Sequence, residues 1–141
     1  MFKDYIAVVT GASRGIGYAT AKALAANGAH VIAIARTVGS LEDLDDDIKA
    51  NGCGSATLVP LNITDYDALD RLGSVIAEKY GKLDILVGNA ATLGDITPIS
   101  HLKPKVWQEL MDINVSANYR LIRSLDPLLR ASRNGRAIFL G

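Results

Sequence analysis

The sequence predicts a doubly wound α/β fold, with five parallel strands in the order 3-2-1-4-5. Short apolar segments alternate with longer amphipathic ones along all 141 residues, which indicates alternating strands and helices. Strands joined by helical crossovers lie parallel in one sheet, with helices on both faces. Because such a sheet is buried on both faces, its strands are continuously apolar, as they are in this sequence.

The first half of the chain is predicted to contain strands at residues 5–10, 30–35 and 56–63 and helices at residues 16–27 and 41–51. The strands are short and rich in β-branched residues. Gly28 after the first helix is a typical C-terminal cap, and Ser40 before the second is a typical N-cap. Pro60 cannot donate a ladder hydrogen bond, so the third strand is expected at a sheet edge.

The second half is predicted to contain strands at residues 83–87 and 136–140 and helices at residues 65–80 and 104–132. Thr64, with Asp67 three residues later, predicts the start of the first of these helices. Pro104 suits the first turn of the long helix, whereas Pro127 is expected to kink that helix or to end its regular part.

The composition excludes several classes of protein. Fifteen basic residues balance fifteen acidic ones, which argues against a nucleic-acid surface or a polybasic membrane patch. The single cysteine, Cys53, cannot form an internal disulfide, and no cluster of His and Cys indicates a metal site. The chain lacks a signal peptide and an apolar run of about 20 residues that could span a membrane. We therefore expect a cytoplasmic protein with residues 1–141 in one domain.

Three glycines lie at the junction between the first strand and the first helix, in TGASRGIG at residues 10–17. A helix N-terminus presents free N–H groups and a partial positive charge, so phosphate is its natural ligand. Gly11 permits the tight turn, Gly15 lets the backbone approach a pyrophosphate and Gly17 lets the helix pack closely on the sheet. No Gly-Lys-Ser/Thr follows, which excludes a P-loop nucleotide triphosphatase. A glycine-rich turn without a ligand is the alternative.

This segment resembles the cofactor loop of the short-chain dehydrogenases/reductases, Thr-Gly-x-x-x-Gly-x-Gly. Residues 88–91 (Gly-Asn-Ala-Ala) are similar to the family's Asn-Asn-Ala-Gly and agree in the middle two positions. Asn114 occupies the position of the family's catalytic asparagine. The resemblance covers the whole chain and implies a Rossmann-type fold. It also implies a cofactor site formed by Gly11, Ser13, Arg14, Gly15, Ile16, Gly17, Arg36, Asn62, Ile63, Asn89 and Ala90.

The residue that follows the second strand bears on the choice of nicotinamide cofactor. An acidic residue there would accept hydrogen bonds from the ribose of NAD, whereas an arginine accommodates the extra phosphate of NADP. Here the residue is Arg36, and Arg14 in the glycine loop is a second cation near the same phosphate. The sequence therefore favours NADP over NAD, unless both arginines are ordinary surface residues. In the family an aspartate usually contacts adenine at the position of Asn62, and Ile63 would pack beside the ring.

The resemblance implies a reaction, hydride transfer between the nicotinamide and a carbonyl or alcohol carbon of a small molecule. Family members use a Ser and a Tyr-x-x-x-Lys pair, and their helix asparagine holds a water in the proton relay. The resemblance places the serine directly after Gly141, so we expect an incomplete, cofactor-binding part of an oxidoreductase, without turnover of its own. Tyr18 and Lys22 match the Tyr-x-x-x-Lys spacing but lie on the helix after the glycine loop. The alternatives are a non-catalytic nucleotide-binding or truncated family member and, third, another Rossmann-like class such as a methyltransferase.

The predicted helix at residues 104–132 carries more apolar residues than one stripe facing the sheet requires. In the resembling family this helix packs against its twin, which implies a homo-oligomer. The fifth strand lies at the sheet edge in the inferred order, and an uncovered apolar edge invites pairing. We therefore expect a separate C-terminal fragment or another chain to cover that edge, and no nucleic-acid or membrane partner.

Overall fold

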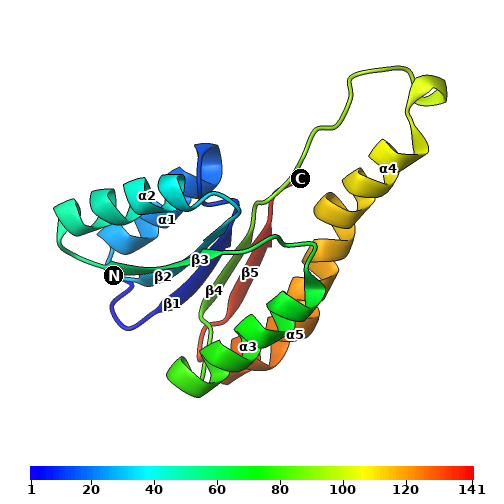
Figure 1. Cartoon of the computed structure of the whole chain (residues 1–141). Coiled ribbons are helices and arrows are strands. Elements are labelled where there is room, and N and C mark those ends of the chain that lie inside the picture. The colour runs from blue at the N-terminus through cyan, green and yellow to red at the C-terminus, as the bar shows by residue number, and fades with distance from the viewer.

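The computed structural model describes all 141 residues and contains one parallel sheet in the order β3-β2-β1-β4-β5. Its strands are β1 (Ile6–Thr10), β2 (His30–Ala35), β3 (Ser55–Pro60), β4 (Ile85–Gly88) and β5 (Arg136–Phe139). Its helical segments are α1 (Gly15–Ala26), α2 (Val38–Asn51), α3 (Tyr66–Tyr80), the 3-10 turn η1 (Ile99–His101), α4 (Pro104–Met111), the π turn η2 (Asp112–Ser116) and α5 (Ala117–Ala131). Helices α1 and α2 cover one face of the sheet, and α3 and α5 cover the other (Figure 1). The predicted Rossmann-type fold and strand order are confirmed.

Alternate residues of the central strands supply two separate cores. Ala7 on β1 packs in one core with small residues of α1 such as Ala21, which lets that helix lie close to the sheet. Its neighbour Val8 points to the opposite face and packs with larger residues of α3 and α5, including Leu69 and Leu121. All five side chains are at most 1% exposed. Burial on both faces is therefore the reason for the continuous apolar runs in the sequence.

The long helix differs from its prediction. Residues 104–132 form α4 and α5 separated by η2, where the helix widens to a π turn. Helix α5 continues past Pro127 to Ala131, so the proline does not end it. Strand β3 pairs only with β2, which confirms the edge position indicated by Pro60.

Two predicted N-caps are wrong. The Thr64 hydroxyl donates to Asn62 Oδ1 (2.8 Å) and accepts no hydrogen bond from the helix. Asp65 caps α3 instead, because its carboxylate accepts a hydrogen bond from a backbone N–H of the first turn (3.1 Å). Helix α2 begins two residues before Ser40, which consequently lies inside the helix.

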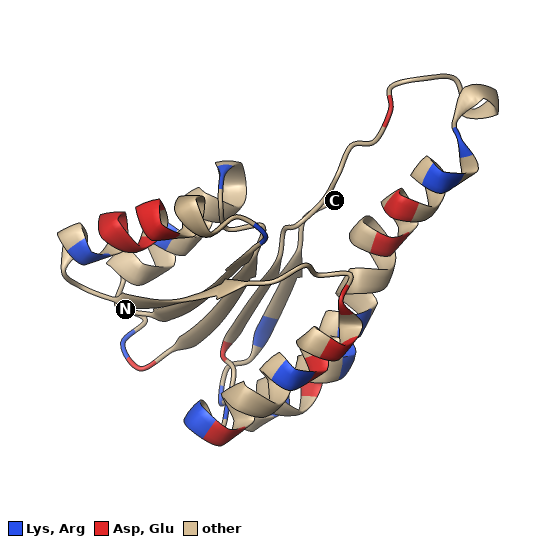
Figure 2. Cartoon of the chain, viewed as in Figure 1, with Lys and Arg blue, Asp and Glu red and all other residues tan.

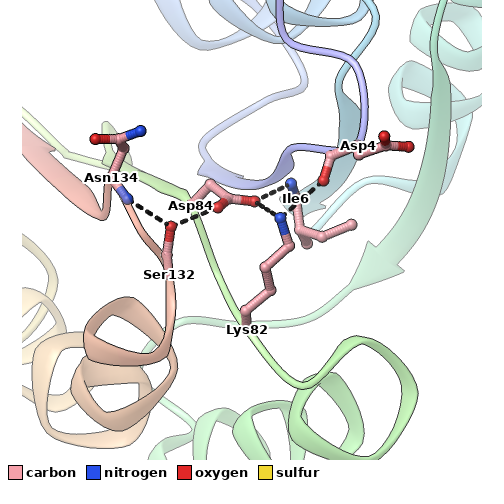
Figure 3. Close-up of polar contacts among 6 residues, drawn as sticks. All are labelled: Asp4, Ile6, Lys82, Asp84, Ser132 and Asn134. Carbon is pink, nitrogen blue, oxygen red and sulfur yellow. Dashed lines mark hydrogen bonds and ion pairs between the residues drawn. The ribbon is translucent and has the colours of Figure 1, made fainter.

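A buried carboxylate joins the amino ends of β1, β4 and β5. Asp84 accepts a hydrogen bond from the Ile6 backbone N–H (2.8 Å) and pairs with the Lys82 ammonium (2.9 Å). Its other oxygen accepts from the Ser132 hydroxyl, which itself accepts from the Asn134 backbone N–H (Figure 3). Burial would raise the pKa of Asp84, but these hydrogen bonds and Lys82 outweigh burial and hold the pKa below its usual range. An ionised carboxylate therefore helps to hold this end of the sheet together.

Candidate functional site

A cavity of about 980 Å³ lies beyond the carboxyl ends of β1, β2 and β4. The strand order reverses between β1 and β4, and such switch points are where open α/β sheets bind ligands. Nine of the eleven residues expected to form the cofactor site line this cavity, namely Gly11, Ser13, Arg14, Gly15, Arg36, Asn62, Ile63, Asn89 and Ala90. The other two, Ile16 and Gly17, do not line it, and neither does Asn114.

Glycines shape the turn between β1 and α1. Gly11 has φ +62°, a conformation that residues with a side chain rarely adopt. A Cβ on Gly17 would lie 2.1 Å from the Gly11 carbonyl oxygen and 2.4 Å from Asn89 Nδ2, so the close approach of α1 requires glycine. At Gly15, by contrast, an added Cβ would meet nothing within 4 Å, and this residue lines the cavity. The loop is thus packed on its inner side and open toward the cavity.

The end of β4 holds this glycine turn in place. Asn89 Nδ2 donates to the carbonyl oxygens of Thr10 (3.3 Å) and Gly11 (3.2 Å). The backbone N–H groups of Asn89 and Ala90 donate to the hydroxyl of Thr10 (2.9 and 3.0 Å), which is fully buried. Sequence reasoning missed Thr10 as a positioning residue, although it is the first residue of the recognised motif.

Positive charge gathers where α1 begins. Its first turn contains no acidic residue, so nothing in that turn offsets the positive end of the helix dipole. Arg14 and Arg36 are exposed, line the cavity and form no ion pair in the structure. The acidic residues of this half of the molecule gather on α2 (Figure 2). An anion could therefore bind here without displacing a partner from either arginine.

Asn62 presents a donor to the cavity. Its Oδ1 already accepts hydrogen bonds from the Thr64 backbone N–H (3.0 Å) and hydroxyl (2.8 Å). Its Nδ2 makes no hydrogen bond within the chain, which leaves two N–H groups for a ligand. Ile63 and Ile113 add apolar surface, and Ile113 was not among the predicted residues because it lies on the distant turn η2.

Asn114 lies in η2 behind the cavity wall. Its Oδ1 accepts from the backbone N–H of Thr92, and its Nδ2 donates to the backbone carbonyl of the same residue, both at 2.9 Å. Thr92 lines the cavity. The asparagine side chain therefore shapes the cavity through the segment that follows β4.

The pair Tyr18 and Lys22 points away from the cavity. The Tyr18 hydroxyl donates to the Asp47 carboxylate on α2, and Lys22 Nζ lies 3.6 Å from the same carboxylate. The hydrogen bond to Asp47, with burial, raises the pKa of Tyr18 to about 12. The pair thus joins α1 to α2.

The two histidines and the single cysteine lie outside the cavity. His30 begins β2 at the opposite end of the sheet, with its ring nitrogens bonded to the hydroxyls of Ser55 (2.6 Å) and Thr57 (2.8 Å). Cys53 is exposed and unpaired, and no group of His, Cys, Asp and Glu in the structure is placed to hold a metal ion. None of the helices has the length and apolar character needed to cross a membrane.

Comparison with known proteins gives consistent matches over the whole chain. The short chain dehydrogenase family model matches residues 5–141. The 3-oxoacyl-[acyl-carrier-protein] reductase FabG of Escherichia coli is 36% identical over 140 residues, which cover 99% of this chain and 55% of that protein. The chain thus spans about half the length of the curated relatives it matches.

Solved structures match equally well. A metagenomic short-chain oxidoreductase in complex with NADP superposes with a TM-score of 0.92 and 35% identity, covering 98% of this chain and 62% of that one. The short chain dehydrogenase from Shigella flexneri also superposes with a TM-score of 0.92 and 35% identity, covering 98% of this chain and 55% of that one.

Proposed function

The chain belongs to the short-chain dehydrogenase family, and we propose that its cavity binds NADP(H) for an oxidoreductase that transfers hydride to or from a carbonyl or alcohol carbon. The observation that carries this proposal is that the glycine loop, the end of β4 and two unpaired arginines line one cavity. The complex of a similar oxidoreductase with NADP supports it. Residues 1–141 act in this proposal as one dinucleotide-binding domain.

The pyrophosphate is proposed to bind at the start of α1. Two phosphate charges would meet the free N–H groups and the positive end of the helix dipole, and no acidic side chain in the first turn opposes them. The open space at Gly15 gives the ligand direct access to backbone. Ser13 lines the same part of the cavity and offers a hydroxyl. Gly17 contributes by letting α1 pack closely on this turn rather than by contact, whereas the exposed Ile16 is proposed to contribute through its place in the first turn of α1.

The additional phosphate of NADP is proposed to bind between Arg14 and Arg36. A dianion beside two guanidinium groups forms charge-assisted hydrogen bonds, and neither arginine loses an ion pair when it binds. The residue directly after β2 is Arg36 rather than a carboxylate, and the next acidic residue is Glu42, so the ribose hydroxyls of NAD would lack their usual acceptor. These features favour NADP(H) over NAD(H).

The adenine is proposed to lie against Ile63, with a hydrogen bond from Asn62 Nδ2 to a ring nitrogen. An aspartate at this position could only accept hydrogen bonds, whereas the Asn62 amide has its oxygen occupied by Thr64 and its donors free. Asn89 and Ala90 line the cavity beside the glycine loop and complete the proposed cofactor contacts.

Residues 1–141 are proposed to bind cofactor without turning over substrate. The bound nicotinamide would supply the hydride, but the cavity lining contains no tyrosine or lysine that could exchange the accompanying proton. Asn114 is the one position of the family's catalytic group that we place in this chain. Because the lining contains neither tyrosine nor lysine, a non-catalytic nucleotide-binding role is the second candidate function.

A second copy of the chain is proposed to cover α4 and α5. Four large apolar or aromatic residues are exposed along α4, η2 and α5, namely Trp107 (50%), Val115 (52%), Tyr119 (60%) and Ile122 (42%). At the free edge of β5, Ile138 is 53% exposed, and a separate C-terminal fragment or another chain is proposed to pair there.

The test is to map NADPH onto the 141-residue chain by amide chemical-shift perturbation. We expect the largest shifts at Gly15, Arg36 and Asn89, and none at His30 on the opposite end of the sheet. Shifts that are absent, or that centre away from the glycine loop, would contradict the proposal. An assay of carbonyl reduction with NADPH in the same preparation separates the two candidate functions, because turnover would exclude the non-catalytic one.

A further inference from the structure

Asn118 is a half-buried polar residue whose amide is only partly satisfied. It lies in the first turn of α5, and its Nδ2 donates to the backbone carbonyl of Asn114 (3.1 Å). Its Oδ1 is buried and has no hydrogen-bond partner. A buried acceptor without a donor lowers stability, and an apolar side chain would avoid that loss. Packing alone therefore does not account for an asparagine here.

Gly88 provides the space for this amide. A Cβ on Gly88 would lie 3.0 Å from Asn118 Oδ1 and 2.3 Å from a ring carbon of Phe139, its register partner on β5. Asn118 from α5 and Phe139 from β5 thus share the place that a side chain on β4 would fill. The family motif has an asparagine at the position of Gly88, whereas in this chain the amide beside Gly88 comes from Asn118 on α5.

The contact continues from Asn118 to the cavity through Asn114. The Asn114 side chain is bonded to both backbone polar groups of Thr92, and Thr92 lines the cavity. Asn114 also lies in the π turn η2, and such turns inside helices are frequent at functional sites. Two successive hydrogen-bonded contacts therefore connect the Asn118 amide to the cavity wall.

We infer that Asn118 is a positioning residue, which fixes the backbone of Asn114 and, through it, the cavity wall at Thr92. The inference deepens the proposed function, on which it rests for the role of Asn114. The group that matters is the donor on Nδ2. A different side chain at position 118 that donates to the same carbonyl should preserve this function. A side chain of similar volume without a donor should not.

The test compares Asn118→Thr with Asn118→Val in the 141-residue chain without cofactor. A threonine hydroxyl in a helix can donate to the carbonyl four residues earlier, and valine has a similar shape without the donor. We expect the Thr92 amide to exchange its hydrogen about fivefold faster in Asn118→Val than in the wild type, as for the loss of one hydrogen bond. In Asn118→Thr the rate should return to the wild-type value. The Val8 amide, in the central strand, should exchange equally in all three chains.

Thr92 exchange that is unchanged in Asn118→Val, or equally accelerated in both variants, would overturn the inference. Faster exchange at Val8 as well would show a general loss of stability and would also count against a positioning role. The readout needs no cofactor, so failure of NADPH to bind would contradict the proposed function and leave this result standing.

A comparison of one substitution in two backgrounds tests the shared space independently. Gly88→Asn should lower the melting temperature in the wild-type background, because the new side chain meets the Phe139 ring and Asn118. The same substitution should lower it less in a chain that carries Asn118→Val and Phe139→Ala. Equal losses in both backgrounds would show that the three residues do not share one space.

Discussion

Asn89 Nδ2 donates to the carbonyl oxygen of Gly11 at 3.2 Å, and this contact ties the end of β4 to the turn that follows β1. The same amide also reaches the carbonyl of Thr10. The two segments lie far apart in the sequence but form adjoining walls of the cavity. The shape of the glycine loop therefore depends on the strand beside it.

Replacing Asn89 by alanine should loosen the glycine loop and weaken NADPH binding. Loss of two hydrogen bonds to carbonyl oxygens should lower the free energy of unfolding by about 2 kcal/mol. The Kd for NADPH should rise about tenfold, measured by titration calorimetry. Asn27→Ala is the matched control, because its amide donates to Ala23 at the far end of α1. Wild-type affinity in Asn89→Ala would show that this contact does not shape the site.

Gly17→Ala should be poorly tolerated, because its methyl group would lie 2.1 Å from the Gly11 carbonyl oxygen. We expect the free energy of unfolding to fall by about 3 kcal/mol, measured by chemical denaturation. Gly39→Ala is the control, since a Cβ there meets nothing within 4 Å and alanine favours the helix by about 0.5–1 kcal/mol. Equal free energies of unfolding for the two variants would contradict the conclusion that α1 approaches the glycine turn too closely for a side chain at Gly17.

Asp84 should make stability depend on pH in the acid range. Its pKa is lower in the folded chain than in the unfolded chain, so the unfolded chain binds the proton first as the pH falls. The stabilisation is present above the unfolded pKa of about 4 and is lost as the pH falls through the folded pKa. We expect the free energy of unfolding, measured by chemical denaturation between pH 7 and pH 2, to fall less with pH in Asp84→Asn than in the wild type.

The substitution Asp84→Asn should also lower stability at pH 7 by about 2 kcal/mol, because Lys82 loses its ion-pair partner. Asp126→Asn is the control, since its pair with Arg130 is exposed and contributes only a few tenths of a kcal/mol, about the value for i,i+4 pairs on helices. If the free energy of unfolding falls equally with pH in Asp84→Asn and in the wild type, this role of the carboxylate is contradicted.

The fold could be predicted from the sequence because its signals are local and repeated. Continuous apolar strands, alternating helices and a glycine turn at the first junction each constrain the same sheet. The N-cap prediction for Ser40 failed because α2 begins two residues earlier, and that for Thr64 failed because the neighbouring Asp65 supplies the accepting side chain. Boundaries of this kind depend on differences of about 1 kcal/mol, which a sequence pattern does not resolve.

The site could be predicted only where a motif marks it. The glycine loop and Asn89 belong to such motifs, and the structure places them on one cavity. The π turn η2 contains no glycine or proline that would predict it from the sequence. Asn118 has the pattern of an ordinary polar residue on a helix. The role of Asn118 can be inferred only from its position beside Gly88 on β4 and Phe139 on β5. Such contacts are set by tertiary packing rather than by local pattern.

The most direct test of the central proposal, that this cavity binds NADP(H) through the glycine loop and two arginines, is a paired titration with NADPH and NADH. We expect the wild-type chain to bind NADPH about tenfold or more tightly than NADH, as for charge-assisted hydrogen bonds to the additional phosphate. The preference should disappear in Arg14→Gln/Arg36→Gln and persist in Arg133→Gln, an exposed arginine outside the cavity. Equal affinity of the wild type for the two cofactors, or a preference that survives loss of both arginines, would contradict it.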